Sequence, residues 1–142
     1  MRDILFRGKR LDNGEWVEGW LYKRVVHLDG CHMNVVVDAI EVYDGKSPLS
    51  IAYYTVDPAT VGQFTGLTDK NGKKIFEGDI VQYYGTYPLM VCIEEGHTKV
   101  RWFDTVTNSE CVDMFFGYDE EAYGDVEVIG NSHDNPELPE TT

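Results

Sequence analysis

Apolar and polar residues alternate along most of the chain, and turn-forming residues separate the alternating runs about every 8–12 residues. Such alternation is typical of half-buried strands, and the many Val and Ile residues favour the pleated backbone. The pattern therefore predicts an all-β protein. The expected strands are 3–7, 15–24, 33–43, 51–56, 63–67, 75–76, 80–84, 89–93, 98–103, 111–116 and 126–129.

Two short segments predict helical turns instead. Pro58–Val61 follows Asp57 and predicts a single turn, and Tyr118–Tyr123 is the other helical candidate. Clusters of Asp, Asn and Gly predict tight turns at 12–14, 29–30 and 69–72. The spacing predicts two small β lobes, residues 1–57 and 58–142, the second an SH3-like, partly open barrel; one compact domain is the alternative.

The segment Thr60–Val81 contains the strongest turn signals of the chain. Its glycines supply positive φ angles or allow close backbone approach, and the Asp69 side chain is placed to close an Asx turn before Asn71 and Gly72. A Gly-Asp pair then leads into an apolar strand, where the Asp accepts backbone N–H groups. The residues expected to form this structural framework are Gly62, Gly66, Asp69, Asn71, Gly72, Gly78 and Asp79.

The same segment, Thr-Val-Gly-Gln-Phe-Thr-Gly-Leu-Thr-Asp-Lys-Asn-Gly-Lys-Lys-Ile-Phe-Glu-Gly-Asp-Ile-Val, resembles the signature of the YopX family of bacteriophages and prophages. Residues 2–7 are similar to the opening strand of that family, and 126–131 with 135–138 to its closing segment. Residues 25–50 and 84–123 match nothing in the family pattern. The resemblance implies the fold and a phage setting, and it implies no catalytic residues because the family has no assigned activity.

The charge of the chain narrows the classes of partner. Its 142 residues carry a formal net charge of −13, which disfavours binding to a phosphate backbone or to an anionic membrane. No apolar run is long enough to span a bilayer, and charged residues interrupt the N-terminus where a secretory signal needs an apolar core. Three widely spaced cysteines, Cys31, Cys92 and Cys111, indicate a reducing compartment. We therefore expect a cytoplasmic protein of the bacterial host cell.

The negative charge lies almost entirely in the second half of the sequence. Residues 1–77 carry 10 basic and 11 acidic side chains, whereas residues 78–142 carry 2 and 14. The densest acidic stretch includes Asp119, Glu120 and Glu121. It is interpreted as a solvated face, as a surface for a basic partner or a mimic of nucleic acid, or as a weak cation site.

No segment carries a convincing cofactor or metal signature. Gly62–Gly66 lacks the Lys and the following helix of a phosphate-binding loop. We therefore interpret its glycines as turn residues. Asp69 and Asn71 supply only part of a calcium loop. His27, Cys31 and His32 cluster in sequence, but adjacent strand residues point to opposite faces and cannot both ligate zinc outside a turn. We expect no cofactor and no bound metal.

Catalytic candidates are equally weak. Cys92 and His97 are near each other in sequence, but nothing indicates an orienting acid or an oxyanion hole. The adjacent acids at 94–95 and 120–121 are explained better as solvated loop charge than as an acid–base pair. We therefore expect that the protein is not an enzyme.

Aromatic residues provide the clearest candidate for an interaction surface. Trp16, Trp20 and Tyr22 have even spacing on one predicted strand and so share a face. Such a face either packs into the core of a small domain or stays exposed. An exposed aromatic face can bind a protein or stack on nucleic-acid bases. A second aromatic group comprises Tyr83, Tyr84 and Tyr87, and the basic cluster of the N-terminal part comprises Arg2, Arg7, Lys9, Arg10, Lys23 and Arg24.

These observations favour a non-enzymatic phage accessory protein that acts through protein–protein contacts, with a host or phage protein as partner. Exposed sheet edges also predict self-association into a homo-oligomer. One alternative is an acidic mimic of nucleic acid that inhibits a basic host protein. Another is a nucleic-acid-binding module that uses the N-terminal basic cluster, against which the overall charge argues.

Overall fold

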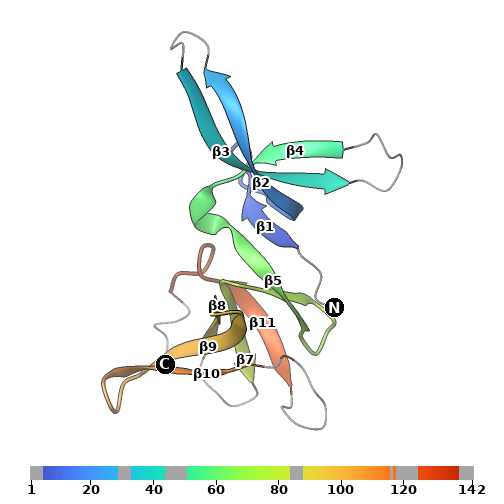
Figure 1. Cartoon of the computed structure of the whole chain (residues 1–142). Helices are drawn as coiled ribbons and strands as arrows, with labels where there is room; N and C mark the ends of the chain where they lie inside the picture. Colours follow the sequence, from blue (N-terminus) through green and yellow to red (C-terminus); the bar gives the residue numbers. More distant parts are fainter. Residues whose placement is uncertain are drawn as a thin grey trace. The chain divides into compact units, whose positions relative to one another are not determined.

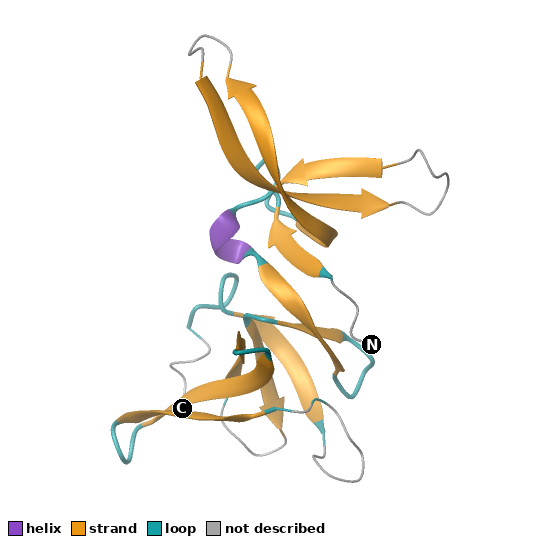
Figure 2. Cartoon of the chain, in the orientation of Figure 1, coloured by secondary structure: helices purple, strands orange, loops and turns teal. Residues whose placement is uncertain are grey.

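In the computed structural model, the described residues, 5–28, 33–43, 51–83, 88–115, 117 and 125–137, confirm the all-β fold. A single 3₁₀ turn, η1 (Pro58–Thr60), is the one element among them that is not a strand (Figure 2). The strands are β1 (Phe6–Lys9), β2 (Trp16–Leu28), β3 (Met33–Tyr43), β4 (Ile51–Thr55), β5 (Gly62–Thr68), β6 (Lys74–Phe76), β7 (Asp79–Tyr83), β8 (Leu89–Glu94), β9 (His97–Asp104), β10 (Ser109–Met114) and β11 (Val126–Asn131) (Figure 1).

The chain divides into two compact units, and the division falls within β5. The first unit comprises Ile4–Gln63, and the second contains the chain from Phe64 onward. This division lies later in the sequence than the expected boundary after residue 57. Several expected features lie outside the described residues: the turn at 29–30, the helical segment 118–123, Arg2, Cys31, His32, Tyr84, Tyr87 and the acidic residues Asp119, Glu120 and Glu121.

The first unit is an antiparallel sheet in the order β4-β3-β2-β1, with the start of β5 paired to β1. The longest pairing joins β2 to β3, from Trp20 opposite Glu41 to Leu28 opposite Met33. Both strands are rich in Val, whose branched side chain fits the pleated surface. The turn before β2 forms as expected: Asn13 Oδ1 accepts from the N–H of Glu15 at 2.9 Å.

Glycines in β1 and β2 allow the backbones of the first unit to approach closely. A Cβ atom built on Gly19 would lie 2.1 Å from the carbonyl oxygen of Glu41, and one on Gly8 would lie 3.0 Å from Cβ of Val56. Ile40, which also lies near both glycines, is fully buried. The core of this unit is therefore built around backbone contacts, and any larger side chain at Gly19 would part β2 from β3.

The turn η1 follows from its local sequence. Asp57 caps it, because its Oδ1 accepts a hydrogen bond from the N–H of Ala59 at 3.0 Å. Pro58 occupies the first position of the turn, where its missing N–H costs nothing. Thr60 Oγ1 accepts from the N–H of Lys9 at 2.9 Å, which ties the turn to β1.

The second unit contains the β5–β6 pair and a five-stranded antiparallel sheet in the order β10-β9-β8-β7-β11. The last strand of this sheet along the chain, β11, returns to pair with the first, β7. Within the described residues β10 and β11 remain the two edges, so the sheet is open and does not close into a barrel. The expectation of a partly open architecture is thus confirmed.

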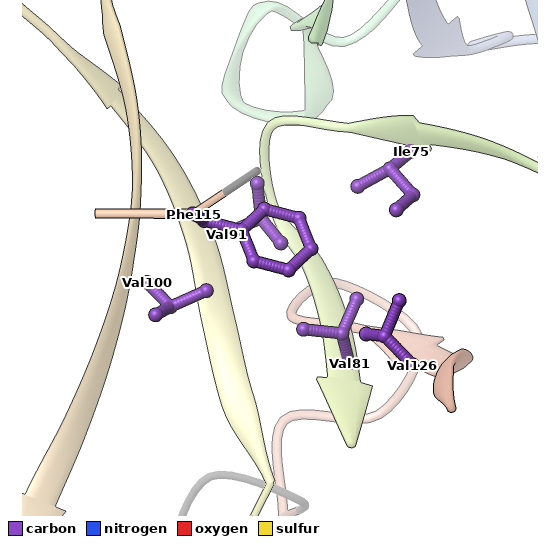
Figure 3. Close-up of a cluster of buried hydrophobic side chains, with 6 residues drawn as sticks. All are labelled: Ile75, Val81, Val91, Val100, Phe115 and Val126. Atoms are coloured by element: carbon purple, nitrogen blue, oxygen red, sulfur yellow. The ribbon is translucent and has the colours of Figure 1, made fainter. Parts of the chain in front are cut away.

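The core of the second unit is a cluster of aliphatic side chains around one ring. The ring of Phe115 lies among side chains from β6, β7, β8, β9 and β11 (Figure 3). Each member of the cluster is at least 96% buried. The cluster comprises Ile75, Val81, Val91, Val100, Phe115 and Val126.

Asp69 fixes the turn between β5 and β6 and reaches the last strand. Its Oδ1 accepts from the N–H groups of Asn71 and Lys73, both at 2.9 Å, so the expected Asx turn forms. Its Oδ2 accepts from the N–H of Val128 on β11 at 3.1 Å. The carboxylate is only 2% exposed, and three backbone donors compensate for its burial.

The turn before β7 depends on a second buried carboxylate. Oδ2 of Asp79 accepts from the N–H of Phe76 at 2.7 Å. Gly78 between them has a φ of +92°, a conformation that side-chain-bearing residues rarely adopt. Gly66 and Gly72 likewise have positive φ, whereas Gly62 is an ordinary strand residue opposite Arg7.

A candidate interaction surface on the first unit

One face of the first sheet gathers the aromatic residues singled out by their spacing. In an antiparallel sheet, residues directly opposite each other point to the same face. Trp16 lies opposite Lys9, Trp20 lies opposite Glu41, and Glu41 in turn lies opposite Tyr53 on β4. We call this the aromatic face; its members are Arg7, Lys9, Trp16, Glu18, Trp20, Tyr22, Arg24, Glu41 and Tyr53.

The rings of the aromatic face are in contact with one another and with cations. Tyr22 and Tyr53 form an edge-to-face pair with ring centroids 5.9 Å apart. The guanidinium of Arg24 lies 5.8 Å from the ring centroid of Tyr53, and that of Arg7 lies 4.7 Å from the ring of Trp16. Each such contact contributes about 0.5–1.5 kcal/mol and holds the rings in place.

Trp20 does not pack into the core. Its side chain is 68% exposed, and Tyr53 is 50% exposed, whereas Trp16 and Tyr22 are half-buried. The core-packing interpretation of the aromatic spacing is therefore wrong for Trp20. Covering an indole this exposed would remove roughly 100 Å² of apolar surface from water, which stabilises a complex by about 2–3 kcal/mol.

The partial burial of Tyr22 also affects its titration. Removal of the phenol from water raises the pKa of Tyr22 above its ordinary value, because burial disfavours the charged phenolate. The nearby Arg24 acts in the opposite direction. The ring of Tyr22 therefore stays neutral throughout the physiological range.

The basic cluster of the N-terminal part is divided between the two faces of the sheet. Arg7, Lys9 and Arg24 belong to the aromatic face. Arg10 lies over the ring of Tyr54 at 4.1 Å, and Lys23 pairs with Asp38 at 2.7 Å. The described members of this cluster therefore do not form the continuous basic surface that the nucleic-acid-binding alternative requires, because strand alternation separates them.

The catalytic candidates Cys92 and His97 do not come together. Cys92 lies opposite Lys99 in the β8–β9 pair, whereas His97 lies opposite Glu94 and is exposed. Across the described ranges, no three His, Cys, Asp or Glu side chains gather closely enough to hold a metal ion. The same ranges contain no helix with the length and apolar character needed to cross a membrane.

Sequence reasoning missed Tyr53 and Glu41 as members of the aromatic face. Both lie on strands distant in sequence from β2, and their register places them beside Trp20. The only local signal is alternation within 51–56, which does not say which strand β4 joins. Their membership follows from pairing, which sequence spacing alone does not give.

The geometry defines an all-β protein of two units with an exposed aromatic face on the first. The family model for the YopX protein matches residues 5–140, so the chain belongs to the YopX family. The sequence is 25% identical to protein EF1440 from Enterococcus faecalis, whose crystal structure matches with a TM-score of 0.52 over 97% of this chain and 99% of that one. No curated protein matches the sequence significantly.

Proposed function

We propose that the protein is a non-enzymatic, phage-associated accessory protein that binds another protein through the aromatic face. The observation that carries this proposal is Trp20, 68% exposed in a row with Glu41 and the half-exposed Tyr53. Trp, Tyr and Arg are the residue types enriched at the centres of protein interfaces. Membership of the YopX family supports the phage association.

The charge of the aromatic face supports a protein as the partner. Glu18 and Glu41 accompany Lys9 and Arg24 on this face, so both signs of charge are present at its surface, whereas Arg7 is buried. A surface that binds a phosphate backbone needs an excess of positive charge to release counterions. A mixed, aromatic surface instead suits a partner protein with its own charges of both signs.

The test is affinity capture from host cells, with purified wild-type protein compared with Trp20→Ala and Tyr53→Ala. We expect a partner that the wild type retains and both variants lose. Leu11→Ala is the matched control, because Leu11 is 62% exposed but is not part of the aromatic face. A partner retained equally by all four proteins would contradict the proposal.

The alternative occupants of the same face have distinct outcomes. A gel shift with single-stranded DNA at low salt, abolished by Trp20→Ala, would assign the face to nucleic acid. A dimer in light scattering that Trp20→Ala dissociates would assign it to a second copy of the chain. We expect neither.

A second candidate function follows from the charge of the second unit. The chain outside Ile4–Gln63 contains 6 Lys and Arg and 17 Asp and Glu, a net charge of −11. We propose, as the alternative role, that this unit occupies a basic nucleic-acid-binding protein of the host. Competition between the protein and DNA for the captured partner would support this role, and simultaneous binding of both would contradict it.

A further inference from the structure

The two edges of the five-stranded sheet differ in how their outward backbone groups are satisfied. At β11, the N–H of Lys70 donates to the carbonyl oxygen of Val126 at 2.9 Å, and the N–H of Val128 donates to Asp69 Oδ2 at 3.1 Å. The register also shifts between Val128 and Gly130, which inserts a bulge. Covering turns and bulges are the usual devices that protect an edge from pairing with another chain.

The edge at β10 has no such cover among the residues that the structure describes. The N–H of Phe115 donates to the carbonyl oxygen of Thr98 at 3.1 Å. Hydrogen-bonded and non-hydrogen-bonded pairs alternate in an antiparallel ladder, so the N–H and C=O groups of Glu110, Val112 and Met114 point outward. Asp113 Oδ1 accepts a hydrogen bond from the N–H of Met114 at 2.8 Å. Glu110 and Val112 therefore each present an outward backbone N–H and an outward backbone C=O.

An apolar surface lies beside this edge. On one face of β9 and β10, the side chains of Phe103, Val112 and Met114 are 42–45% exposed. Next to them is an open hollow of about 270 Å³. Its lining residues are Met90, Arg101, Trp102, Phe103 and Glu110.

The cations of this surface are already neutralised within it. Arg101 Nη1 donates to Glu110 Oε1 at 2.7 Å, and its other amino group pairs with Glu94. Hydrogen bonding to Glu110, and after it to Cys92, raises the pKa of Arg101. Lys99 lies 3.7 Å from the same Glu94. The exposed Asp113, on the opposite face of β10, has no cation opposite it in the ladder, where its partner is Val100.

We infer that β10 accepts, as an added strand, an extended segment of a partner protein in which Lys or Arg alternates with aliphatic residues. Alternation sends the aliphatic side chains of such a segment toward Val112 and Phe103 and its cations toward Asp113. A second copy fits poorly, because its own β10, Ser109–Met114, carries two acidic residues and no Lys or Arg that could face Asp113. This site is independent of the aromatic face, which lies on the first unit.

The test uses the full chain and a capped peptide of sequence Lys-Val-Lys-Val-Lys, with Glu-Val-Glu-Val-Glu as its charge-reversed control. We expect the basic peptide to bind in the millimolar range or tighter and to slow hydrogen exchange at the amides of Glu110 and Val112. The acidic peptide should bind at least about tenfold more weakly. Unchanged exchange at both amides under a saturating concentration of basic peptide would overturn the inference.

Two variants separate edge pairing from general attraction to an acidic surface. Val112→Pro removes an outward N–H that β9 does not use, so the fold tolerates it while the added strand loses a donor. We expect this variant to bind the basic peptide at least about tenfold more weakly, and Val106→Ala, altered at a side chain 92% exposed, to bind it as the wild type does.

Equal binding by Val112→Pro and the wild type would overturn strand addition, provided that the exchange pattern of the variant elsewhere in the sheet is unchanged. If exchange elsewhere is altered, Asp113→Lys replaces it as the deciding variant, since it leaves the backbone intact and should also weaken binding about tenfold. Dimerisation of the wild type that Val112→Pro abolishes would instead assign the edge to a second copy.

Discussion

The two units differ in how many apolar side chains they bury. Among the described residues, the second unit buries a cluster around Phe115, whereas the buried apolar side chains of the first unit are Ala39, Ile40 and Val56. The first unit instead exposes Trp20 and Tyr53 on one face of its sheet. The net charge of Ile4–Gln63 is −2, from 6 basic and 8 acidic residues, against −11 for the rest of the chain.

This contrast indicates where stability and binding reside. A buried cluster supplies hydrophobic stabilisation within the second unit. In the first unit, paired strands and close backbone contacts supply a larger share of the stability. Large apolar side chains left exposed lower the free energy of a complex when a partner covers them. The larger buried core therefore belongs to the second unit, and the binding face that we propose belongs to the first.

The distribution of tryptophans allows the comparison to be measured. Trp16 and Trp20 belong to the first unit, and Trp102 belongs to the second. Replacing Trp102 by Phe leaves fluorescent tryptophans in the first unit only. Replacing Trp16 and Trp20 by Phe leaves a tryptophan in the second unit only. Each stability variant is made in the protein that keeps tryptophan only in the unit that the variant alters.

The largest effect is expected from Ile75→Ala in the core of the second unit. Ile75 is fully buried, so the truncation leaves a cavity and lowers the free energy of unfolding by about 2–5 kcal/mol. Urea denaturation followed by Trp102 fluorescence measures it. A loss no greater than that of Val106→Ala, expected within about 0.5 kcal/mol, would show that the cluster does not stabilise this unit.

Gly19→Ala is expected to have the next largest effect, and in the first unit. The new Cβ would meet the backbone carbonyl of Glu41, so β2 and β3 must separate locally at a cost of about 1–3 kcal/mol. Denaturation followed by Trp16 and Trp20 fluorescence measures this. The control is Leu11→Ala, at a side chain 62% exposed in the same unit, which should cost no more than about 0.5 kcal/mol; equal losses would argue against close packing as the cause.

Asp69→Asn tests the turn that joins β5 to β6 and touches β11. The amide keeps one acceptor but presents an NH₂ group to the N–H of Val128 or to the turn, so we expect a loss of about 1–3 kcal/mol in the second unit. The matched control is Asp104→Asn, which alters an exposed side-chain acceptor for the N–H of Val106. Loss of stability equal to that of the control would mean that the buried carboxylate is replaceable.

The smallest effect concerns the exposed pair of Arg10 and Asp12. Hydrogen bonding to Arg10 lowers the pKa of Asp12 below its ordinary value of about 3.9. The contribution of the pair to stability is therefore present above that ordinary value and is lost as the pH falls through the lower pKa of the folded protein. NMR titration of Asp12 in the wild type and in Arg10→Ala measures it; an unchanged pKa in the variant would contradict the pairing.

The positions of the strands were predictable because alternation and turn residues are local signals. Expected strands at 33–43 and 89–93 correspond to β3 and β8 within a residue, and the turn after Asp69 forms from its own sequence. The exposure of Trp20 was not predictable, nor was its position next to Glu41 and Tyr53. Both depend on pairing between strands that are distant in the sequence. The bulge between Val128 and Gly130 is likewise a result of pairing with β7.

The return of β11 to β7 also orders events during synthesis. The first unit has all its strands once Gln63 has been made, whereas the core of the second lacks Val126 until 63 more residues have been added. Domains form as units during synthesis, the N-terminal one first, and pairings distant in sequence form slowly. The first unit can therefore fold and expose its aromatic face while the chain is still attached to the ribosome, before β11 of the second unit has been synthesised.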